Sequence, residues 1–180
     1  MFGPILRGER CVLRPPRKDE LSVYRSWFAD MEVTRYILRT TPLSEAQEEE
    51  WFTRTAEAQD RVAWIIEVDG KPVGTTGIGV IDWLNRHGTT GIVIGEKRLW
   101  RRGIASEVMA LRTRYAFREL NLQKLKTEAF VENEASRRAL MKTGYRESGI
   151  FHQELFRDGN WHDLWEGELL REDWEKTQPT

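Results

Sequence analysis

The first half of the chain predicts two helices followed by three strands. Leu21, Tyr24 and Phe28 recur at intervals of three and four residues, which is typical of one face of a helix. Ser44 and Gln47 have the spacing of a capping box, so a second helix is expected to begin there. The predicted elements are a strand at 9–14, helices at 19–28 and 44–56, and strands at 62–68, 73–83 and 89–94. Asp69-Gly70, after the strand at 62–68, has the residue types of a hairpin turn.

The second half changes its hydrophobic period from helical to alternating and back again. Ile104, Val108 and Tyr115 lie at helical spacing, whereas the stretch at 122–131 alternates with period two. Asn133 has the residue type of a helix N-cap. The predicted elements are a helix at 104–120, a strand at 122–131, a helix at 133–141, and strands at 145–156 and 161–169. Together the two halves predict an α+β fold, with a mixed and mostly antiparallel sheet of about seven strands and about four flanking helices.

Composition and charge favour one globular domain over residues 1–180. Hydrophobic residues make up 39% and charged residues 32%, and the formal net charge is −1. A protein that coats nucleic acid or an anionic membrane needs a large positive excess, so neither is an expected partner. No secretory signal or membrane span is expected, because the apolar runs are short and the start of the chain is charged. The single cysteine, Cys11, fits a reducing cytoplasm.

The near-neutral total hides a basic central segment, since residues 96–146 hold 13 basic and 6 acidic side chains. Within this segment, Trp100 and two arginines lead into Gly103 and the predicted helix from 104. The first N–H groups of a helix lack intrahelical partners, and a preceding glycine lets the backbone fold closely around a phosphate. The expected ligand of this loop is a diphosphate or polyphosphate, although an ordinary helix start after a solvated basic loop gives the same pattern.

Other site motifs are missing from the sequence. There is no P-loop, and Gly77-Ile78-Gly79 lacks the third glycine of a dinucleotide fingerprint. His87, His152 and His162 are scattered, so no metal site is expected.

Two motifs resemble the GNAT N-acetyltransferases, in the branch that contains ribosomal-protein N-terminal and spermidine N-acetyltransferases. The segment at 94–107, with the sequence IGEKRLWRRGIASE, is similar to the acetyl-CoA-binding segment of that branch. The segment at 131–145, VENEASRRALMKTGY, is similar to its Asn-x-x-Ser helix with the Gly-aromatic exit. The similarity extends over nearly the whole chain.

The resemblance implies a sheet splayed between the strand at 89–94 and the strand at 124–131, with acetyl-CoA as co-substrate. The pantetheine arm is then expected to pair with main chain at Ile92 and Ile94, and the pyrophosphate to rest on the loop. The residues that the resemblance implies for cofactor binding are Ile92, Ile94, Arg101, Arg102, Gly103, Ile104, Ala105, Ser106, Asn133 and Arg138.

The same resemblance leaves the acid–base chemistry less defined. The family's usual tyrosine acid, seven residues after Asn133, is replaced by Leu140, so Ser136 is the expected general acid with Asn133 beside it. The family's usual glutamate on the strand before the basic loop is replaced by Thr89 or Thr90. No base is assigned. The candidates are Glu128, Glu154, Asp163, His162 and a chain of waters.

The leading hypothesis is an N-acetyltransferase that uses acetyl-CoA to acetylate a primary amine by direct attack in a ternary complex. The acceptor is a protein N-terminal α-amine, a polyamine, an amino sugar or an aminoglycoside, and the protein is a monomer or homodimer. Trp83, Trp161 and Trp165 are the candidate aromatic residues of the acceptor pocket. The alternatives from other classes are a catalytically silent acyl-CoA sensor and an arginine-rich nucleic-acid-binding module.

Overall fold

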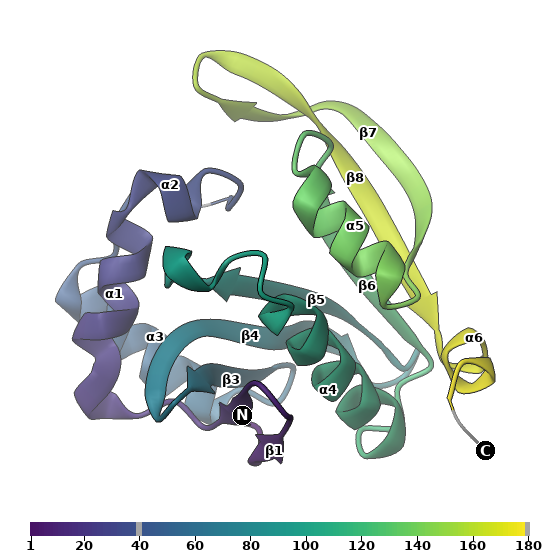
Figure 1. Cartoon of the computed structure of the whole chain (residues 1–180), viewed down its shortest axis with the longest axis horizontal. Coiled ribbons are helices and arrows are strands. Elements are labelled where there is room, and N and C mark those ends of the chain that lie inside the picture. Colours follow the sequence, from purple (N-terminus) through teal and green to yellow (C-terminus); the bar gives the residue numbers. More distant parts are fainter. Residues whose placement is uncertain (39–40, 179–180) are drawn as a thin grey trace.

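A computed structural model describes residues 1–38 and 41–178, which form one mixed sheet with helices on both of its faces (Figure 1). The strand order across the sheet is β1-β2-β3-β4-β5-β6-β8-β7. The strands are β1 (Leu6–Arg7), β2 (Val12–Arg14), β3 (Val62–Val68), β4 (Lys71–Asp82), β5 (His87–Ile94), β6 (Lys124–Phe130), β7 (Arg146–Arg157) and β8 (Asn160–Leu170). The helices are α1 (Leu21–Ala29), α2 (Met31–Thr34), α3 (Glu45–Glu57), α4 (Ile104–Arg118), α5 (Glu134–Lys142) and α6 (Arg171–Lys176), with short 3-10 turns at Lys18–Glu20 and Lys97–Leu99.

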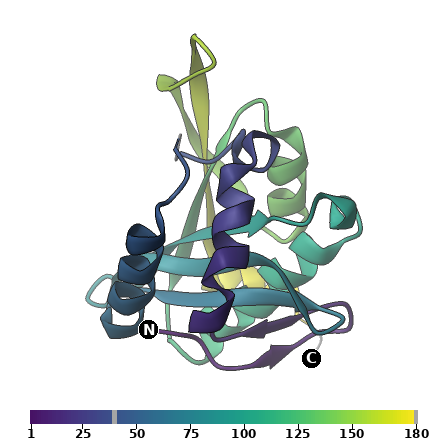
Figure 2. The ribbon, with the colours of Figure 1, turned by 90° about the vertical axis from the view of Figure 1, so that its left-hand side faces the viewer.

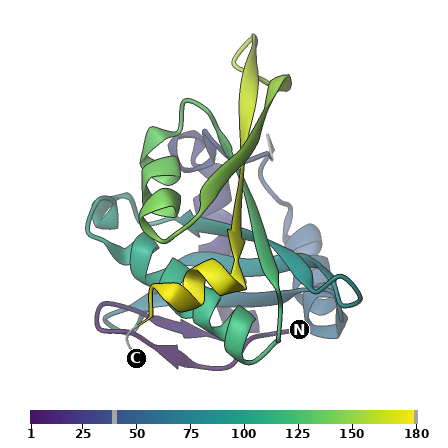
Figure 3. The ribbon, with the colours of Figure 1, turned by 90° about the vertical axis from the view of Figure 1, so that its right-hand side faces the viewer.

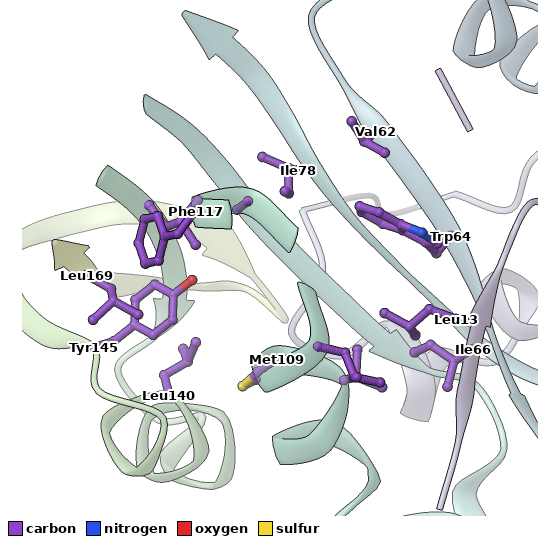
Figure 4. Packing of buried hydrophobic residues seen from close by; sticks show 14 of the residues in the cluster. Leu13, Val62, Trp64, Ile66, Ile78, Met109, Phe117, Leu140, Tyr145 and Leu169 are labelled. Carbon is purple, nitrogen blue, oxygen red and sulfur yellow. The ribbon is translucent and has the colours of Figure 1, made fainter. Parts of the chain in front are cut away.

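Alternation along β3 separates two hydrophobic clusters. Ile65 packs with Tyr24 and Trp27 of α1, while its neighbours Trp64 and Ile66 belong to the larger cluster on the opposite side. That larger cluster includes buried residues of α4 and α5 (Figure 4). The views from the two sides show α1 and α3 over one face and α4 and α5 over the other (Figures 2 and 3). The sheet is therefore covered on both faces, as the mixed topology requires.

The expected splay lies between β5 and β6. These strands pair in parallel from His87 with Lys124 to Thr90 with Thr127. Past that pair, β5 continues to Ile94 against β4, while β6 turns away with β8 (Figure 1). The prediction of a splayed mixed sheet is confirmed.

Several local predictions are confirmed by hydrogen bonds and dihedral angles. Ser44 and Gln47 form the reciprocal capping box of α3. The hairpin turn between β3 and β4 has φ +50° at Asp69 and φ +74° at Gly70, and both angles belong to a primed turn. Asn133 caps α5, because its side-chain oxygen accepts from the backbone N–H of Ser136 at 3.2 Å.

The prediction of a single strand at 9–14 is wrong. The chain turns between Gly8 and Cys11, so two short strands replace one, and the sheet has eight strands rather than about seven. Two short helices, α2 and α6, were also not expected, which raises the helix count in the described residues from about four to six. Both span fewer than two helical turns, so neither shows a repeated helical spacing of apolar residues.

Candidate active site

A cleft of about 250 Å³ opens where β5 and β6 separate. Its walls come from segments that are far apart in the sequence. They include Gly91 and Ile92 on β5, Met109 on α4, Phe130 on β6, and Asn133 and Ser136 at the start of α5. Three of the residues expected from the sequence, Ile92, Asn133 and Ser136, are thus brought together around one space.

The direction of the β5 main chain follows from two side-chain hydrogen bonds. The Thr90 carbonyl accepts from the hydroxyl of Thr127 on β6 at 3.2 Å, and the Gly91 carbonyl accepts from the hydroxyl of Thr76 on β4 at 2.8 Å. Since successive residues of a strand direct their main-chain groups to opposite edges, the N–H and carbonyl of Ile92 face the β6 side. They lie past the last β5–β6 register pair, so the Ile92 N–H points into the cleft.

Ile94, two residues further along β5, has the same main-chain direction. Its carbonyl accepts from the indole N–H of Trp100 at 2.8 Å. Trp100 therefore ties the basic loop to the end of the separated strand. This carbonyl already has a partner within the chain, whereas Ile92 lies beside the cleft.

The basic loop ends in a helix start without a side-chain cap. Gly103 is the N-cap residue of α4 with φ +80°, and Arg101 also has a positive φ, +62°. A Cβ on Gly103 would have no heavy atom within 4 Å, so the space in front of the helix is open. The side chain of Ile104 is buried in the core and anchors the first turn. Exposed Arg101 and Arg102 flank free N–H groups, and this donor set fits a pyrophosphate.

The start of α5 differs, because the side chain of its N-cap residue, Asn133, accepts a hydrogen bond from the first turn. Among the described residues, the Ser136 hydroxyl has no hydrogen-bond partner, which leaves it available to a ligand in the cleft. Leu140 is buried and lines the same cleft with hydrocarbon. Arg138 lies on the exposed face of α5, pairs with Glu134 at 2.6 Å and is not among the cleft residues.

Sequence reasoning missed Arg112, which is 1% exposed and lines the cleft. One terminal nitrogen, Nη1, donates to the Gly91 carbonyl at 2.7 Å and to the Thr76 hydroxyl at 2.8 Å. Burial lowers the pKa of the guanidinium from its ordinary value, against an opposing effect of the nearby Tyr145 hydroxyl. A signal was available, since Arg112 follows buried Val108 by four residues and therefore lies on the buried face of α4.

Glu107, in the first turn of α4, was also missed. Its carboxylate accepts from the backbone N–H groups of Glu9 and Arg10 at 2.6 and 2.9 Å. Partial burial opposes ionisation, but these hydrogen bonds prevail and hold the pKa of Glu107 below its ordinary value. The carboxylate thereby connects the turn between β1 and β2 to α4, the helix that follows the basic loop.

The family model of the Acetyltransferase (GNAT) domain matches residues 10–146. The chain belongs to the GNAT acetyltransferase family. It is 32% identical over 165 residues to the uncharacterised N-acetyltransferase YoaA of Bacillus subtilis (strain 168), and the match covers 89% of this chain and 93% of that protein. The expected family and enzyme class are confirmed: the protein is a GNAT N-acetyltransferase.

Two further relatives illustrate the range of this GNAT family. YdaF of the same organism, provisionally named a ribosomal N-acetyltransferase, is 33% identical over 107 residues, which cover 59% of this chain and 58% of YdaF. The crystal structure of spermidine N-acetyltransferase from Vibrio cholerae, in complex with CoA and spermine, matches with a TM-score of 0.88 at 19% identity. That match covers 93% of this chain and 99% of the other, and it shows that the fold is shared.

Phe130, which lines the GNAT cleft together with Tyr36, is the centre of an aromatic cluster. Its ring lies 5.6 Å from that of Tyr36 and 5.7 Å from that of His162, between centroids. Glu128 is the one carboxylate among the described residues that line the cleft. It is therefore the candidate base that the structure brings to the site.

His162 is held away from a role as base. Its Nδ1 faces the Glu132 carboxylate at 2.9 Å and its Nε2 faces the Arg157 carbonyl at 3.1 Å. An imidazole can donate to two such acceptors only when it is protonated. The hydrogen bond that His162 donates to the Glu132 carboxylate, with the one it donates to the Arg157 carbonyl, raises the pKa of His162 and favours the imidazolium form.

The other candidate bases and the candidate tryptophans lie outside the described cleft. Asp163 accepts from His152 and from the backbone of Gln153, and Glu154 is exposed on β7. Trp165 is buried in the core, so the expectation that it lines a pocket was wrong. Trp83 and Trp161 are exposed and also absent from the lining of this cleft.

Within 1–38 and 41–178, no group of three or more His, Cys, Asp or Glu side chains could hold a metal ion. Over the same ranges, no helix combines the length and the apolar character needed to cross a bilayer.

Proposed function

We propose that this GNAT protein transfers the acetyl group of acetyl-CoA to a primary amine, by direct attack within a ternary complex, and that a protein N-terminal α-amine is the acceptor. The observation that carries the proposal is the cleft at the β5–β6 separation. Ile92, Ser136 and Glu128 all border this one space, and they supply a main-chain N–H, a hydroxyl and a carboxylate.

The donor is proposed to extend from the basic loop into the cleft. The first-turn N–H groups of α4, with Arg101, Arg102 and Ser106, hold the pyrophosphate, because an uncapped helix start and two guanidinium groups both favour an anion. The pantetheine arm pairs with Ile92 and approaches Asn133. Arg138 is paired with Glu134, and it contacts acetyl-CoA only when that ion pair breaks. Its expected contribution to acetyl-CoA affinity is therefore the smallest among the proposed binding residues.

Three groups are proposed to act on the reacting atoms. The acceptor nitrogen binds to the carbonyl carbon as the C–S bond breaks, and the Ile92 N–H stabilises the negative charge that develops on the carbonyl oxygen. Glu128 binds the amine and takes its proton. The Ser136 hydroxyl donates a proton to the departing sulfur and regains one from solvent, while the proton taken up by Glu128 is released to solvent.

The choice of a protein N-terminus rests on the hairpin of β7 and β8 and on YdaF. Arg157 of this hairpin donates to the Ile37 carbonyl, and Ile37 lines the cleft, so the hairpin borders the opening. Phe151, Phe156 and Trp161 expose large apolar surfaces along it, which suits contact with an extended peptide. YdaF, whose provisional name refers to ribosomal acetylation, is consistent with this acceptor class.

Thiol release from acetyl-CoA tests the proposal. Purified protein is incubated with peptides that carry free α-amines, with the same peptides blocked at the α-amine, and with spermidine and an aminoglycoside. We expect release with the free peptides and none with the blocked ones. A preference for spermidine or the aminoglycoside would overturn the N-terminal acceptor, and binding of acetyl-CoA without release on any amine would favour the sensor hypothesis instead.

A further inference from the structure

Arg112 is a buried cation without a buried anion. No salt bridge involves it in the part of the chain that the structure describes, and its Nε has no hydrogen-bond partner there. Uncompensated burial of a charge is costly, and a well-packed apolar residue of similar volume is often as stable or more stable. Core packing alone therefore gives no reason for an arginine at this place in α4.

The hydrogen bonds of Arg112 end on the peptide group that matters most for acetyl transfer. Its Nη1 donates to the Gly91 carbonyl, and that carbonyl shares a planar peptide unit with the Ile92 N–H. In a trans peptide the N–H points opposite to the carbonyl. The Arg112 guanidinium therefore binds this peptide at one edge of β5, and the Ile92 N–H leaves it at the other edge. Polarisation of a carbonyl by a charged donor strengthens the N–H of the same peptide.

We propose that Arg112 is a positioning residue that acts through the Gly91–Ile92 peptide, fixing and polarising the Ile92 N–H that stabilises the oxyanion of acetyl transfer. The inference rests on the proposed function, because it assigns the role of oxyanion donor to Ile92. Thr76 assists, since its hydroxyl donates to the same carbonyl and also accepts from Arg112. The guanidinium contributes charge that the neutral threonine lacks.

The test compares Arg112→Met with Arg112→Lys, Thr76→Val and Arg114→Met. Met removes the charge at similar volume, Lys restores a charge, and Val removes the neutral donor. Arg114 is an exposed arginine two residues away on the same helix and serves as the matched control. Each variant is assayed for kcat, for KM and Kd of acetyl-CoA, for melting temperature, and for the infrared stretch of the bound thioester carbonyl without acceptor.

In Arg112→Met we expect kcat to fall about 10-fold, less than the roughly 100-fold typical when an oxyanion donor itself is removed. We expect the affinity for acetyl-CoA to change by less than about threefold, because a single hydrogen bond contributes little. The carbonyl stretch should move to higher frequency, and the melting temperature should stay level or rise. Arg112→Lys should restore most of the lost kcat and most of the shift in carbonyl frequency. Thr76→Val should change both quantities less than Arg112→Met does, and Arg114→Met should match the wild type.

The contrary outcomes are distinct. A well-folded Arg112→Met protein with wild-type kcat and carbonyl frequency overturns the inference alone. If Arg112→Met fails to fold, a wild-type kcat and carbonyl frequency in Thr76→Val, which removes a hydrogen bond to the same Gly91 carbonyl, overturns it instead. A wild-type protein that does not bind acetyl-CoA overturns the proposed function, and the inference with it.

Discussion

The helices α4 and α5 both line the cleft, but their first turns are finished differently. The N-cap of α4 is Gly103, which offers no side-chain cap, whereas the N-cap of α5 is Asn133, whose side chain satisfies the Ser136 N–H. Their first-turn carboxylates differ as well. Glu107 accepts from backbone N–H groups of the β1–β2 turn, and Glu134 pairs with an exposed arginine of its own helix.

The difference separates two uses of a helix start. An uncapped first turn keeps its N–H groups and its positive dipole end for an external anion. A capped first turn is complete by itself, so it can present a side chain, here Ser136, at a fixed place. On this basis we propose that α4 binds the pyrophosphate of acetyl-CoA and that α5 acts near the thioester.

The largest expected effect comes from closing the open start. Gly103→Glu places a side chain at φ +80° and a carboxylate beside the pyrophosphate, so the affinity for acetyl-CoA should fall about 100-fold or more, or ~2.7 kcal/mol. Calorimetric titration measures this loss. The matched control is Gly159→Glu in the β7–β8 turn, where φ is +75° and the space is equally open. Equal loss in both variants would show that strain, rather than the phosphate loop, is responsible.

Removing the side chain presented by α5 should affect the chemical step rather than binding. In Ser136→Ala we expect kcat to fall about 100-fold, the lower end for a general acid. The KM for acetyl-CoA should change by less than about threefold, because the lost hydroxyl makes at most one ground-state hydrogen bond. Steady-state kinetics separates the two quantities. A wild-type kcat would mean that the sulfur leaves without a proton from Ser136.

Removing the cap of α5 sharpens the comparison further. Asn133→Ala should cost about 1 kcal/mol of folding stability, as should Ser44→Ala at the start of α3, because each deletes an N-cap hydrogen bond. Only Asn133→Ala should also weaken acetyl-CoA binding, by roughly threefold to tenfold. Denaturant unfolding and calorimetric titration of both variants check this. Equal acetyl-CoA affinities in the two variants would show that Asn133 acts only as a helix cap.

The smallest expected effect concerns the two first-turn carboxylates and pH. The pKa of Glu107 is lowered in the folded protein, so its contribution to stability is present above the unfolded value near 4.5 and is lost as pH falls through the folded pKa. Glu107→Gln should therefore be less stable than the wild type at pH 7, with the gap narrowing below about pH 4.5. Melting curves across pH measure this gap. The control Glu134→Gln should show little difference, and an equal gap there would contradict the assignment.

Local chemistry was predictable wherever the relevant residues are close in sequence. The capping box at Ser44 and the cap at Asn133 each need only three residues of context, and the turn at 69–70 needs two. The separation of β5 from β6 followed from family resemblance rather than from periodicity. Glu107 could not be linked with Glu9 and Arg10 from sequence, because only the packing of the β1–β2 turn on α4 brings them together.

Arg112 stands between these cases. Its helical spacing places it on the buried face of α4, but its partner, the Gly91 carbonyl, depends on the register of β5. Leu140 stands where the family resemblance predicts a tyrosine, and this buried leucine lines its part of the cleft with hydrocarbon. The sequence therefore indicates which residues are available, and tertiary register decides which peptide group they address.

The short parallel ladder has a consequence for how the molecule comes apart. In the described structure, β5–β6 is the one ladder that connects the β1–β5 half of the sheet with the β6–β8 half, and it has four register pairs. Within each half most neighbouring strands are also close in sequence, so each half is expected to form before the ladder closes. The Lys126 carbonyl faces Thr90, so the main chain of Glu128, two residues further along β6, also faces β5. Amide hydrogens of Thr90 and Glu128 should then exchange earlier than those inside either half. Acetyl-CoA bound across the two halves should slow that exchange, because it stabilises the state in which the ladder is closed.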